Sequence, residues 1–338
     1  MFPALRSYGW SLLVAAACND PSTPTAPLPA ALSVPGLYNI NDPLRRTCTS
    51  SRHRLFDFWI GDWSVTGANG NSAGVSRITR ELDGCAVVEN FRGTFGRSLN
   101  RLDRLTGLWL QDYVDATGMT LRLFGEPTTV GTMAMQDSVR AIPNGPSLAS
   151  RFQWTRNADG TVQQLWLFSQ NGGAAFANNF NGRYATNTAY QEPAPPTPAA
   201  CITRPAYRVL DTLVGRWTLS TTAGTIGTAT ITHSAAQCML EERFQSTSGY
   251  ELRAFLYLDR FIGRWYRTQI DNEGSGFRLS GTVSETTLSA SGRAVTAEQP
   301  LPLRLRWTFT DPNRLVQTWE AEDGEWKEVA SITWTRVP

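Results

Sequence analysis

The chain of 338 residues has only two histidines, His53 and His233, and is poor in lysine and glutamate. Its formal net charge is +2 and no basic stripe stands out, so the electrostatic footprint of a nucleic-acid-binding protein is absent. No apolar run approaches the roughly 20 residues that a membrane-spanning helix needs. We therefore expect no nucleic-acid partner and no transmembrane helix.

The sequence also has little that points to catalysis. No cluster of histidine, cysteine and carboxylate residues has metal-ligand spacing, and no two carboxylates form an evident acid/base couple. Gly70 to Gly74 spell Gly-x-Ser-x-Gly, but a nucleophile elbow needs a strand that turns into a helix. Polar Asn-Gly-Asn-Ser favours a hairpin turn instead. We expect no enzyme, no metal site and no cofactor.

Four of the five cysteines form two pairs with the same spacing. Cys48 and Cys85 are 37 positions apart, and so are Cys201 and Cys238. A duplicated spacing is typical of a disulfide framework, so we expect one bridge in each pair. Disulfides persist in oxidising compartments, which predicts an exported protein. Four reduced core cysteines remain the alternative.

The fifth cysteine, Cys18, ends a segment that is typical of bacterial secretory signals. Residues 1–18 carry one cation, Arg6, then an apolar run and small residues. The end of this segment, Ala-Ala-Ala-Cys, resembles a lipobox, in which Cys18 becomes lipidated. A signal cleaved after Ala-x-Ala remains the alternative, because Ala15 stands where a lipobox usually has leucine. Residues 19–47 are rich in proline and predict a tether. We therefore expect an anchor on the periplasmic side of a bacterial membrane.

Residues 48–186 and 201–338 are two copies of one domain, separated by a Pro-rich linker at 187–200. Each copy has a Gly-x-Trp inside its cysteine pair, ending at Trp63 or Trp217. Each predicts one or two helical turns, at 55–60 and 207–214, and then about ten short strands joined by turns. Consecutive strands without crossover helices form an antiparallel meander, and closure into a barrel removes its exposed edges. The expected fold is therefore all-β, with two tandem barrels.

The first repeat is similar to a bacterial exported domain family of unknown function. The stretches that carry this likeness are FDFWIGDW at 56–63, DGC at 83–85, GLW at 107–109 and DGTVQQLW at 159–166. More broadly, each repeat resembles the calycin superfamily, which includes lipocalins and nitrobindins. Nitrobindin-like relatives hold haem through a histidine late in the barrel. Neither histidine falls there, so we expect no haem.

Polar residues on apolar strand faces are the candidates for a ligand site. Glu89 and Glu242 each share a strand face with a cysteine, an aliphatic residue and a phenylalanine, and two glutamines lie in similar patterns. If these faces point inward, further aromatic and polar residues join them. The full candidate set is Glu89, Trp109, Gln111, Gln164 and Trp166 in the first repeat, and Glu242, Trp265, Arg267, Gln317 and Trp319 in the second.

A buried carboxylate must be paired or hydrogen-bonded, or its pKa rises. Arg122 and Arg278 are available partners, although strand parity puts them on the opposite face. The cluster is then either a polar knot that fixes strand register or a set of groups that orient a small apolar ligand. Trp63 and Trp217 are expected in the core of the barrel floor, whereas Trp109 and Trp166 could line a cavity.

These observations favour a non-enzymatic, exported, membrane-anchored accessory subunit that docks on a membrane protein assembly. The alternative is a lipocalin-like carrier or sensor that binds a small apolar ligand in the first barrel. The residues do not select one assembly or one ligand.

Overall fold

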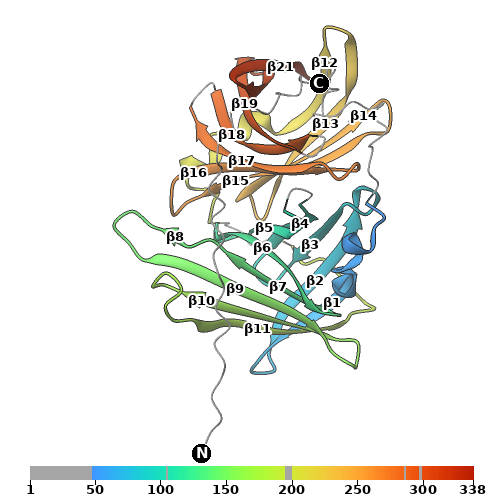
Figure 1. The fold of residues 1–338 in the computed structure, drawn as a ribbon, viewed down its shortest axis with the longest axis vertical. Helices are drawn as coiled ribbons and strands as arrows, with labels where there is room; N and C mark the ends of the chain where they lie inside the picture. Colours follow the sequence, from blue (N-terminus) through green and yellow to red (C-terminus); the bar gives the residue numbers. More distant parts are fainter. Residues whose placement is uncertain (1–47, 104–105, 195–199, 285–286, 297–298) are drawn as a thin grey trace, which may run out of the picture. The chain divides into compact units, whose positions relative to one another are not determined.

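The computed structural model describes residues 48–103, 106–194, 200–284, 287–296 and 299–338. The expected signal segment, the tether and Cys18 lie outside these residues. The described chain forms two closed, ten-stranded antiparallel barrels in tandem (Figure 1). The expected all-β class is thereby confirmed. No helix in the described part is long and apolar enough to cross a membrane.

The first barrel is a meander that closes where β11 pairs with both β1 and β10. The two-residue β8 (Arg140–Ala141) pairs with β9 outside the ring. The ring strands are β1 (Gly61–Gly67), β2 (Ser72–Glu81), β3 (Ala86–Phe91), β4 (Gly96–Leu102), β5 (Trp109–Val114), β6 (Thr120–Thr129), β7 (Thr132–Asp137), β9 (Ser147–Arg156), β10 (Val162–Ser169) and β11 (Ala177–Thr186).

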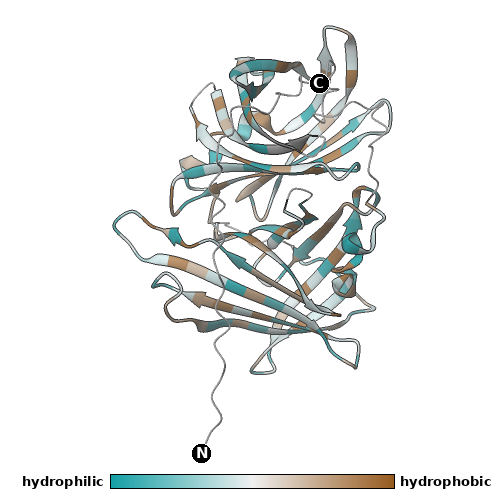
Figure 2. Ribbon diagram, viewed as in Figure 1, coloured by the Kyte–Doolittle hydropathy of each residue, from teal (hydrophilic) through white to brown (hydrophobic). Residues whose placement is uncertain are grey.

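The second barrel repeats this plan and closes through pairing of β12 with β21. Its strands are β12 (Gly215–Thr221), β13 (Gly224–Ser234), β14 (Met239–Ser246), β15 (Glu251–Asp259), β16 (Arg264–Asp271), β17 (Gly276–Val283), β18 (Thr287–Thr296), β19 (Gln299–Asp311), β20 (Arg314–Asp323) and β21 (Glu325–Arg336). Figure 2 shows hydrophobic and hydrophilic residues alternating along the strands of both barrels, as expected when one strand face lies inside.

Short helical turns precede each barrel. They are η1 (Ser51–Arg54) and η2 (Asp57–Trp59) in the first copy, and α1 (Pro205–Arg208) and η4 (Asp211–Leu213) in the second. The indole N–H of Trp63 donates to the carbonyl of Trp59 at 2.9 Å, and that of Trp217 donates to Leu213 at 2.8 Å. Both tryptophans are buried, which confirms their expected place in the core.

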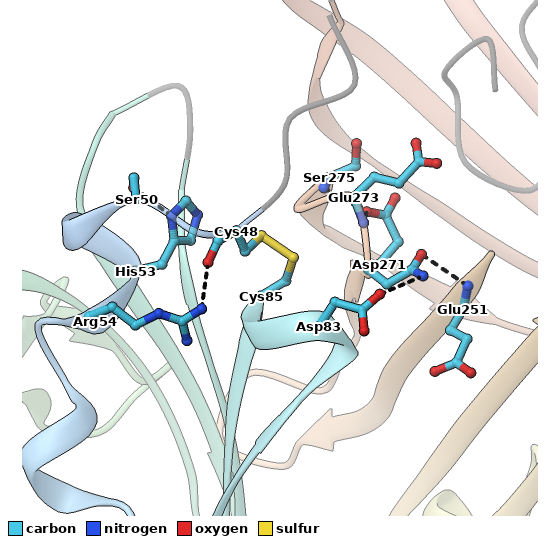
Figure 3. Close-up of a disulfide and its surroundings, with 11 residues drawn as sticks. Cys48, Ser50, His53, Arg54, Asp83, Cys85, Glu251, Asp271, Glu273 and Ser275 are labelled. Atoms are coloured by element: carbon cyan, nitrogen blue, oxygen red, sulfur yellow. Dashed lines mark hydrogen bonds between the residues drawn. A yellow bond between two sulfur atoms is a disulfide. The ribbon is translucent and has the colours of Figure 1, made fainter. Parts of the chain in front are cut away.

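Both expected disulfides form, Cys48–Cys85 and Cys201–Cys238. In the first barrel the bridge follows η3 (Leu82–Gly84), where the backbone turns with positive φ at all three residues. A Cβ on Gly84 would lie 2.7 Å from the Arg54 guanidinium, which donates to the carbonyl of Cys48 at 3.1 Å (Figure 3). Glycine is favoured here because Gly84 has a φ of +94°, a backbone conformation that other residues rarely adopt.

The described residues all belong to one compact unit, and the two barrels touch through their outer faces. The apolar core of the second barrel is continuous with four buried residues from the outer faces of β3, β4 and β5. These residues are Ala86, Val88, Leu99 and Val114. Apolar burial therefore contributes to holding the barrels together.

Charged side chains complete this contact. Arg122 on β6 donates to Asp259 at 2.8 Å, and Arg278 on β17 donates to Asp112 through Nε and Nη2, both at 2.8 Å. Asp83 accepts from the side chain of Asn272 at 3.3 Å. Arg122 and Arg278 are therefore not the partners of the interior glutamates. Strand parity places them outside, where each meets an aspartate of the other barrel.

Candidate functional site

Glu89 lies inside the first barrel because β3 alternates between two buried environments. Val87 and Phe91 join the core of the first barrel, whereas Ala86 and Val88 face the second barrel. Glu89 shares the parity of Val87 and Phe91, and it is only 5% exposed. The strand therefore carries a carboxyl into an apolar interior.

Two serine hydroxyls hold this carboxyl. Ser76 on β2 and Ser98 on β4 each donate to one oxygen of Glu89, both at 3.2 Å, and both serines are fully buried. Burial raises the pKa of Glu89 to about 7, although the two serine hydrogen bonds and the charge of Arg97 act in the opposite direction. The carboxyl therefore changes its charge near neutral pH.

A chain of hydrogen bonds leads from Gln111 to Glu89. The Gln111 amide donates to the Asn100 side-chain oxygen at 2.7 Å, and the Asn100 amide donates to Ser98 at 3.0 Å. Asn100 also donates to the carbonyl of Val87 at 2.9 Å. Along this chain Gln111 donates to Asn100, Asn100 to Ser98, and Ser98 to Glu89. The predicted residues Glu89 and Gln111 thus belong to one network.

Gln164 on β10 lies in a second hydrogen bond of the same barrel. Its side-chain oxygen accepts from the Tyr184 hydroxyl at 2.6 Å. Burial holds the pKa of Tyr184 well above its ordinary value, and the charge on Glu89 adds to that effect. Tyr184 is therefore close enough to Glu89 to sense its charge.

The predicted tryptophans of the first barrel differ in exposure. Trp109 is buried and meets Phe56 edge to face, with ring centres 5.7 Å apart. Trp166 stacks on Phe152 with ring centres 5.1 Å apart, and Phe152 stacks in turn on Trp154 at 5.4 Å. Trp166 is only partly buried, although it packs against the core. Trp109 thus belongs to the packed floor, and Trp166 lies where solvent reaches the interior.

In the second barrel the equivalent glutamate has a cationic partner. One nitrogen of Arg267, Nη2, donates to both oxygens of Glu242, at 3.1 and 2.9 Å. Both residues are 2% exposed. The guanidinium also lies over the rings of Trp307 and Trp319, 5.8 and 5.9 Å from their centres. The interior of this barrel is therefore occupied by its own ion pair.

The remaining predicted residues of the second barrel are buried as well. Gln317 accepts from the Trp334 indole at 3.2 Å, as Gln164 accepts from Tyr184 in the first barrel. Trp319 meets Phe277 edge to face, with ring centres 5.5 Å apart. Trp265 is buried, with 8% of its surface exposed.

Sequence reasoning did not identify Ser76, Ser98, Asn100 and Tyr184 as site residues. In β4 polar residues occupy both faces, because the outer face carries Arg97 and Arg101 toward the second barrel. No apolar periodicity therefore marks the inner face. Comparison of the two repeats could have found the serines and the asparagine, because the second repeat has apolar residues in their places.

His53 lies in η1, whereas His233 lies on β13, where its ring contacts Asp211 of η4. His53 Nδ1 is 2.8 Å from the hydroxyl of Ser50, and His233 Nε2 is 2.9 Å from a carboxylate oxygen of Asp211. The stretch Gly70 to Gly74 lies in the β1–β2 hairpin, as expected. Over the described ranges, no group of three or more histidine, cysteine or acidic residues could hold a metal ion.

Comparisons with known proteins add little to this picture. No protein-family model and no curated protein matches the chain. Among solved structures, the chain is similar to a Nostoc punctiforme protein of unknown function from the DUF3598 family. The identity is 9%, the match covers 85% of this chain and 99% of that one, and the TM-score is 0.20. The site must therefore be interpreted from its own residues.

Proposed function

We propose that the chain is a non-enzymatic, exported and membrane-anchored interaction subunit that docks on a membrane-associated protein assembly. The observation that carries this proposal is the filled interior of the second barrel. Arg267 and Glu242 occupy it together with three tryptophans, so what this barrel offers to other molecules is its outer surface. Within this proposal each barrel is calycin-like and distantly similar to nitrobindin.

Buried charges support a fixed arrangement of the two barrels. Arg253 on β15 is 2% exposed and pairs with Glu81 of the first barrel and Glu241 of the second. Arg97 of the first barrel also donates to Glu241, at 2.9 Å. A buried charge that loses its partner destabilises a protein strongly. Arrangements of the two barrels that separate these pairs are therefore disfavoured. A rigid pair of domains presents one defined surface to an assembly.

A groove lies on this outer surface beside the contact between the barrels. Its volume is about 380 Å³, and it is lined by residues of η3 and β2 from the first barrel and of β13, β14 and β15 from the second. Arg243 lines the groove and is exposed. This groove is the place where we expect a docking segment of the assembly to bind.

Co-purification tests the interaction function. The full-length protein, tagged after Pro338 and extracted from its own membranes in a mild detergent, should elute with stoichiometric membrane proteins. Arg243→Glu should reduce that recovery at least tenfold, whereas Arg306→Glu, a charge reversal on the exposed face of β19, should not. Elution of the wild type as a free monomer under all extraction conditions would overturn the proposal.

The membrane anchor is tested separately. Cys18→Ser should shift the protein from the membrane fraction to the soluble periplasmic fraction. Equal membrane retention of Cys18→Ser and the wild type would contradict a lipid on Cys18 and leave the docking surface as the means of attachment.

A second candidate function is a carrier or sensor that binds a small ligand in the first barrel. The specific observation in its favour is Glu89, since neutral Gln111 stands where the second barrel has Arg267. The two functions involve different parts of the molecule, namely the outer surface and the interior of the first barrel.

A further inference from the structure

The two barrels have a buried glutamate at equivalent positions, but its hydrogen-bond partners differ. Strand register makes the positions equivalent: Glu89 lies opposite Ser98 as Glu242 lies opposite Ala254. Asn100 lies opposite Gln111 as Leu256 lies opposite Arg267. The glutamate is thus kept in both copies while its surroundings differ.

The differences around the glutamate form a consistent set. The first barrel has Ser76, Ser98, Asn100 and Gln111, and the second has Ala229, Ala254, Leu256 and Arg267 in the corresponding register positions. The first barrel therefore surrounds its carboxyl with neutral hydrogen-bond donors. The second barrel removes those donors and supplies a cation from within the chain.

Two neutral hydrogen bonds leave a carboxylate incompletely satisfied. Each oxygen of Glu89 accepts one bond from a serine, whereas a carboxylate has about four acceptor sites. A buried carboxylate is stabilised most effectively by a hydrogen-bonded cation. In the second barrel that cation is the guanidinium of Arg267, which also lies over two indole rings.

The aromatic rings of this arrangement are kept in the first barrel. Trp154 and Trp166 lie opposite Gln164 and Phe152, as Trp307 and Trp319 lie opposite Gln317 and Leu305. Indole faces attract cations, and Trp is the best of the aromatic side chains for this contact. The first barrel thus has the same glutamate and the same tryptophans as the second. It has the neutral amide of Gln111 at the position of the Arg267 guanidinium.

Solvent reaches this part of the first barrel. Gln164, Trp166 and Phe168 share the inward parity of buried Val162, yet all three are partly exposed. Their counterparts Gln317, Trp319 and Ala321 are at most 3% exposed. The indole N–H of Trp166 is buried without an acceptor among the residues that the structure describes. A small molecule can therefore approach from this end.

We propose that the first barrel binds a small organic cation with N–H donors, a protonated amine or guanidine, whose charged group pairs with Glu89 as Arg267 pairs with Glu242. The cation donates to the free acceptor sites of the carboxylate and packs against Trp166. This inference rests on the carrier function and names its ligand class. It is independent of the docking function of the outer surface.

n-Propylguanidine is the direct probe, because it has the structure of an arginine side chain beyond Cα. Its uncharged isostere, n-propylurea, is the matched control. Titration of the full-length protein, followed by calorimetry and tryptophan fluorescence, should give saturable binding of n-propylguanidine with at least tenfold weaker binding of n-propylurea.

Two variants of the first barrel locate the site. Glu89→Gln keeps the shape and the serine contacts and should weaken n-propylguanidine binding at least tenfold. Gln111→Arg places the internal cation of the second barrel in the first and should abolish binding while leaving a cooperative thermal transition. Undiminished binding in both variants would overturn the proposal.

Arg267→Ala tests whether n-propylguanidine can bind beside a buried glutamate of the second barrel, in the space that the arginine side chain leaves. The melting temperature of this variant should rise further with n-propylguanidine than that of the wild type, and n-propylurea should not produce this difference. If the probe rescues Arg267→Ala but does not bind the wild type, the site in the first barrel does not exist as proposed.

The outcome for the neutral probe separates this inference from the carrier function. Equal binding of n-propylurea and n-propylguanidine, abolished by Gln111→Arg, would refute the cation and retain a ligand-binding barrel. Absence of binding by both probes in the wild type, with rescue of Arg267→Ala, would count against the cation and the carrier together. Co-purification with membrane proteins is unaffected by either result.

Discussion

Arg278 of the second barrel donates two hydrogen bonds, both 2.8 Å long, to Asp112 of the first. The hydroxyl of Tyr257 donates to the same carboxylate at 2.5 Å. Burial alone would raise the pKa of Asp112, but Arg278, the Tyr257 hydrogen bond and the charge of Arg101 together hold that pKa below its ordinary value. The contact between the barrels is therefore anchored by an ionised carboxylate that remains charged in mild acid.

Replacement of Arg278 should destabilise the pair of barrels. Arg278→Ala leaves Asp112, which is 1% exposed, without its cation, and we expect a loss of roughly 3–5 kcal/mol in the free energy of unfolding. Arg183→Ala removes an arginine from an exposed pair with Asp159, where solvent screens the charges, and should cause a much smaller loss. Urea denaturation of both variants measures the difference, and similar losses would contradict the role of the buried pair.

The buried carboxyl of Glu89 should make stability depend on pH. The pKa of Glu89 is about 7 in the folded protein, against the ordinary glutamate value of 4.5 in the unfolded chain, so the folded state binds more protons between these pH values. Stability should therefore fall as pH rises from 4.5 to 7, by about 3 kcal/mol from this group. Glu89→Gln should remove that part of the slope in urea denaturation at a series of pH values.

The matched control for this pH series is Glu325→Gln, the same substitution on an exposed surface hairpin. The difference in unfolding free energy between Glu89→Gln and the wild type should favour the variant increasingly toward pH 7 and then level off. A difference that is constant with pH would show that Glu89 has no raised pKa.

The ion pair inside the second barrel should be costly to break but replaceable as a unit. Arg267→Ala leaves Glu242 buried and should lower the free energy of unfolding by roughly 3–5 kcal/mol. The double variant Glu242→Leu with Arg267→Met removes both charges and should be clearly more stable than Arg267→Ala. A double-mutant cycle in urea measures the coupling. Equal instability of the two variants would indicate that packing, rather than the unpaired charge, decides the loss.

The two disulfides should contribute about equally. Each closes a loop over a sequence separation of 37, which corresponds to about 4 kcal/mol in the chain-entropy model. Paired replacement of Cys48 and Cys85 by serine, or of Cys201 and Cys238, should therefore lower the urea midpoint by similar amounts. Reductant should have the same effect on the wild type. A midpoint that is insensitive to reductant would contradict this.

The sequence predicts the fold because the relevant patterns are local or duplicated. Alternation along each strand and the equal cysteine spacing are sufficient to derive two barrels with one bridge each. The same alternation places Glu89 and Glu242 inside. The inward placement of these residues depends on strand geometry alone, which period-two patterns report directly.

The sequence does not predict what covers an outward-facing residue. Strand parity places Arg122 and Arg278 on the outer faces. That Arg122 pairs with Asp259 and Arg278 with Asp112 follows only from the contact between the two barrels. In the same way, the strand with Ser98 is polar on both faces because one face binds the other barrel. A strand buried on two sides by different surroundings has no simple periodicity.

The Cys48–Cys85 bridge has a mechanical consequence. A tension applied to the chain on the N-terminal side of Cys48 passes through the two sulfur atoms to the start of β3. The turns η1 and η2 and strand β1 are then bypassed, so they are not peeled from the barrel one after another. The force arrives next to η3, whose Asp83 is hydrogen-bonded to Asn272 of the second barrel. Reduction of this single bond would redirect the pull into the barrel floor, where Phe56 and Trp59 would be the first large buried side chains withdrawn.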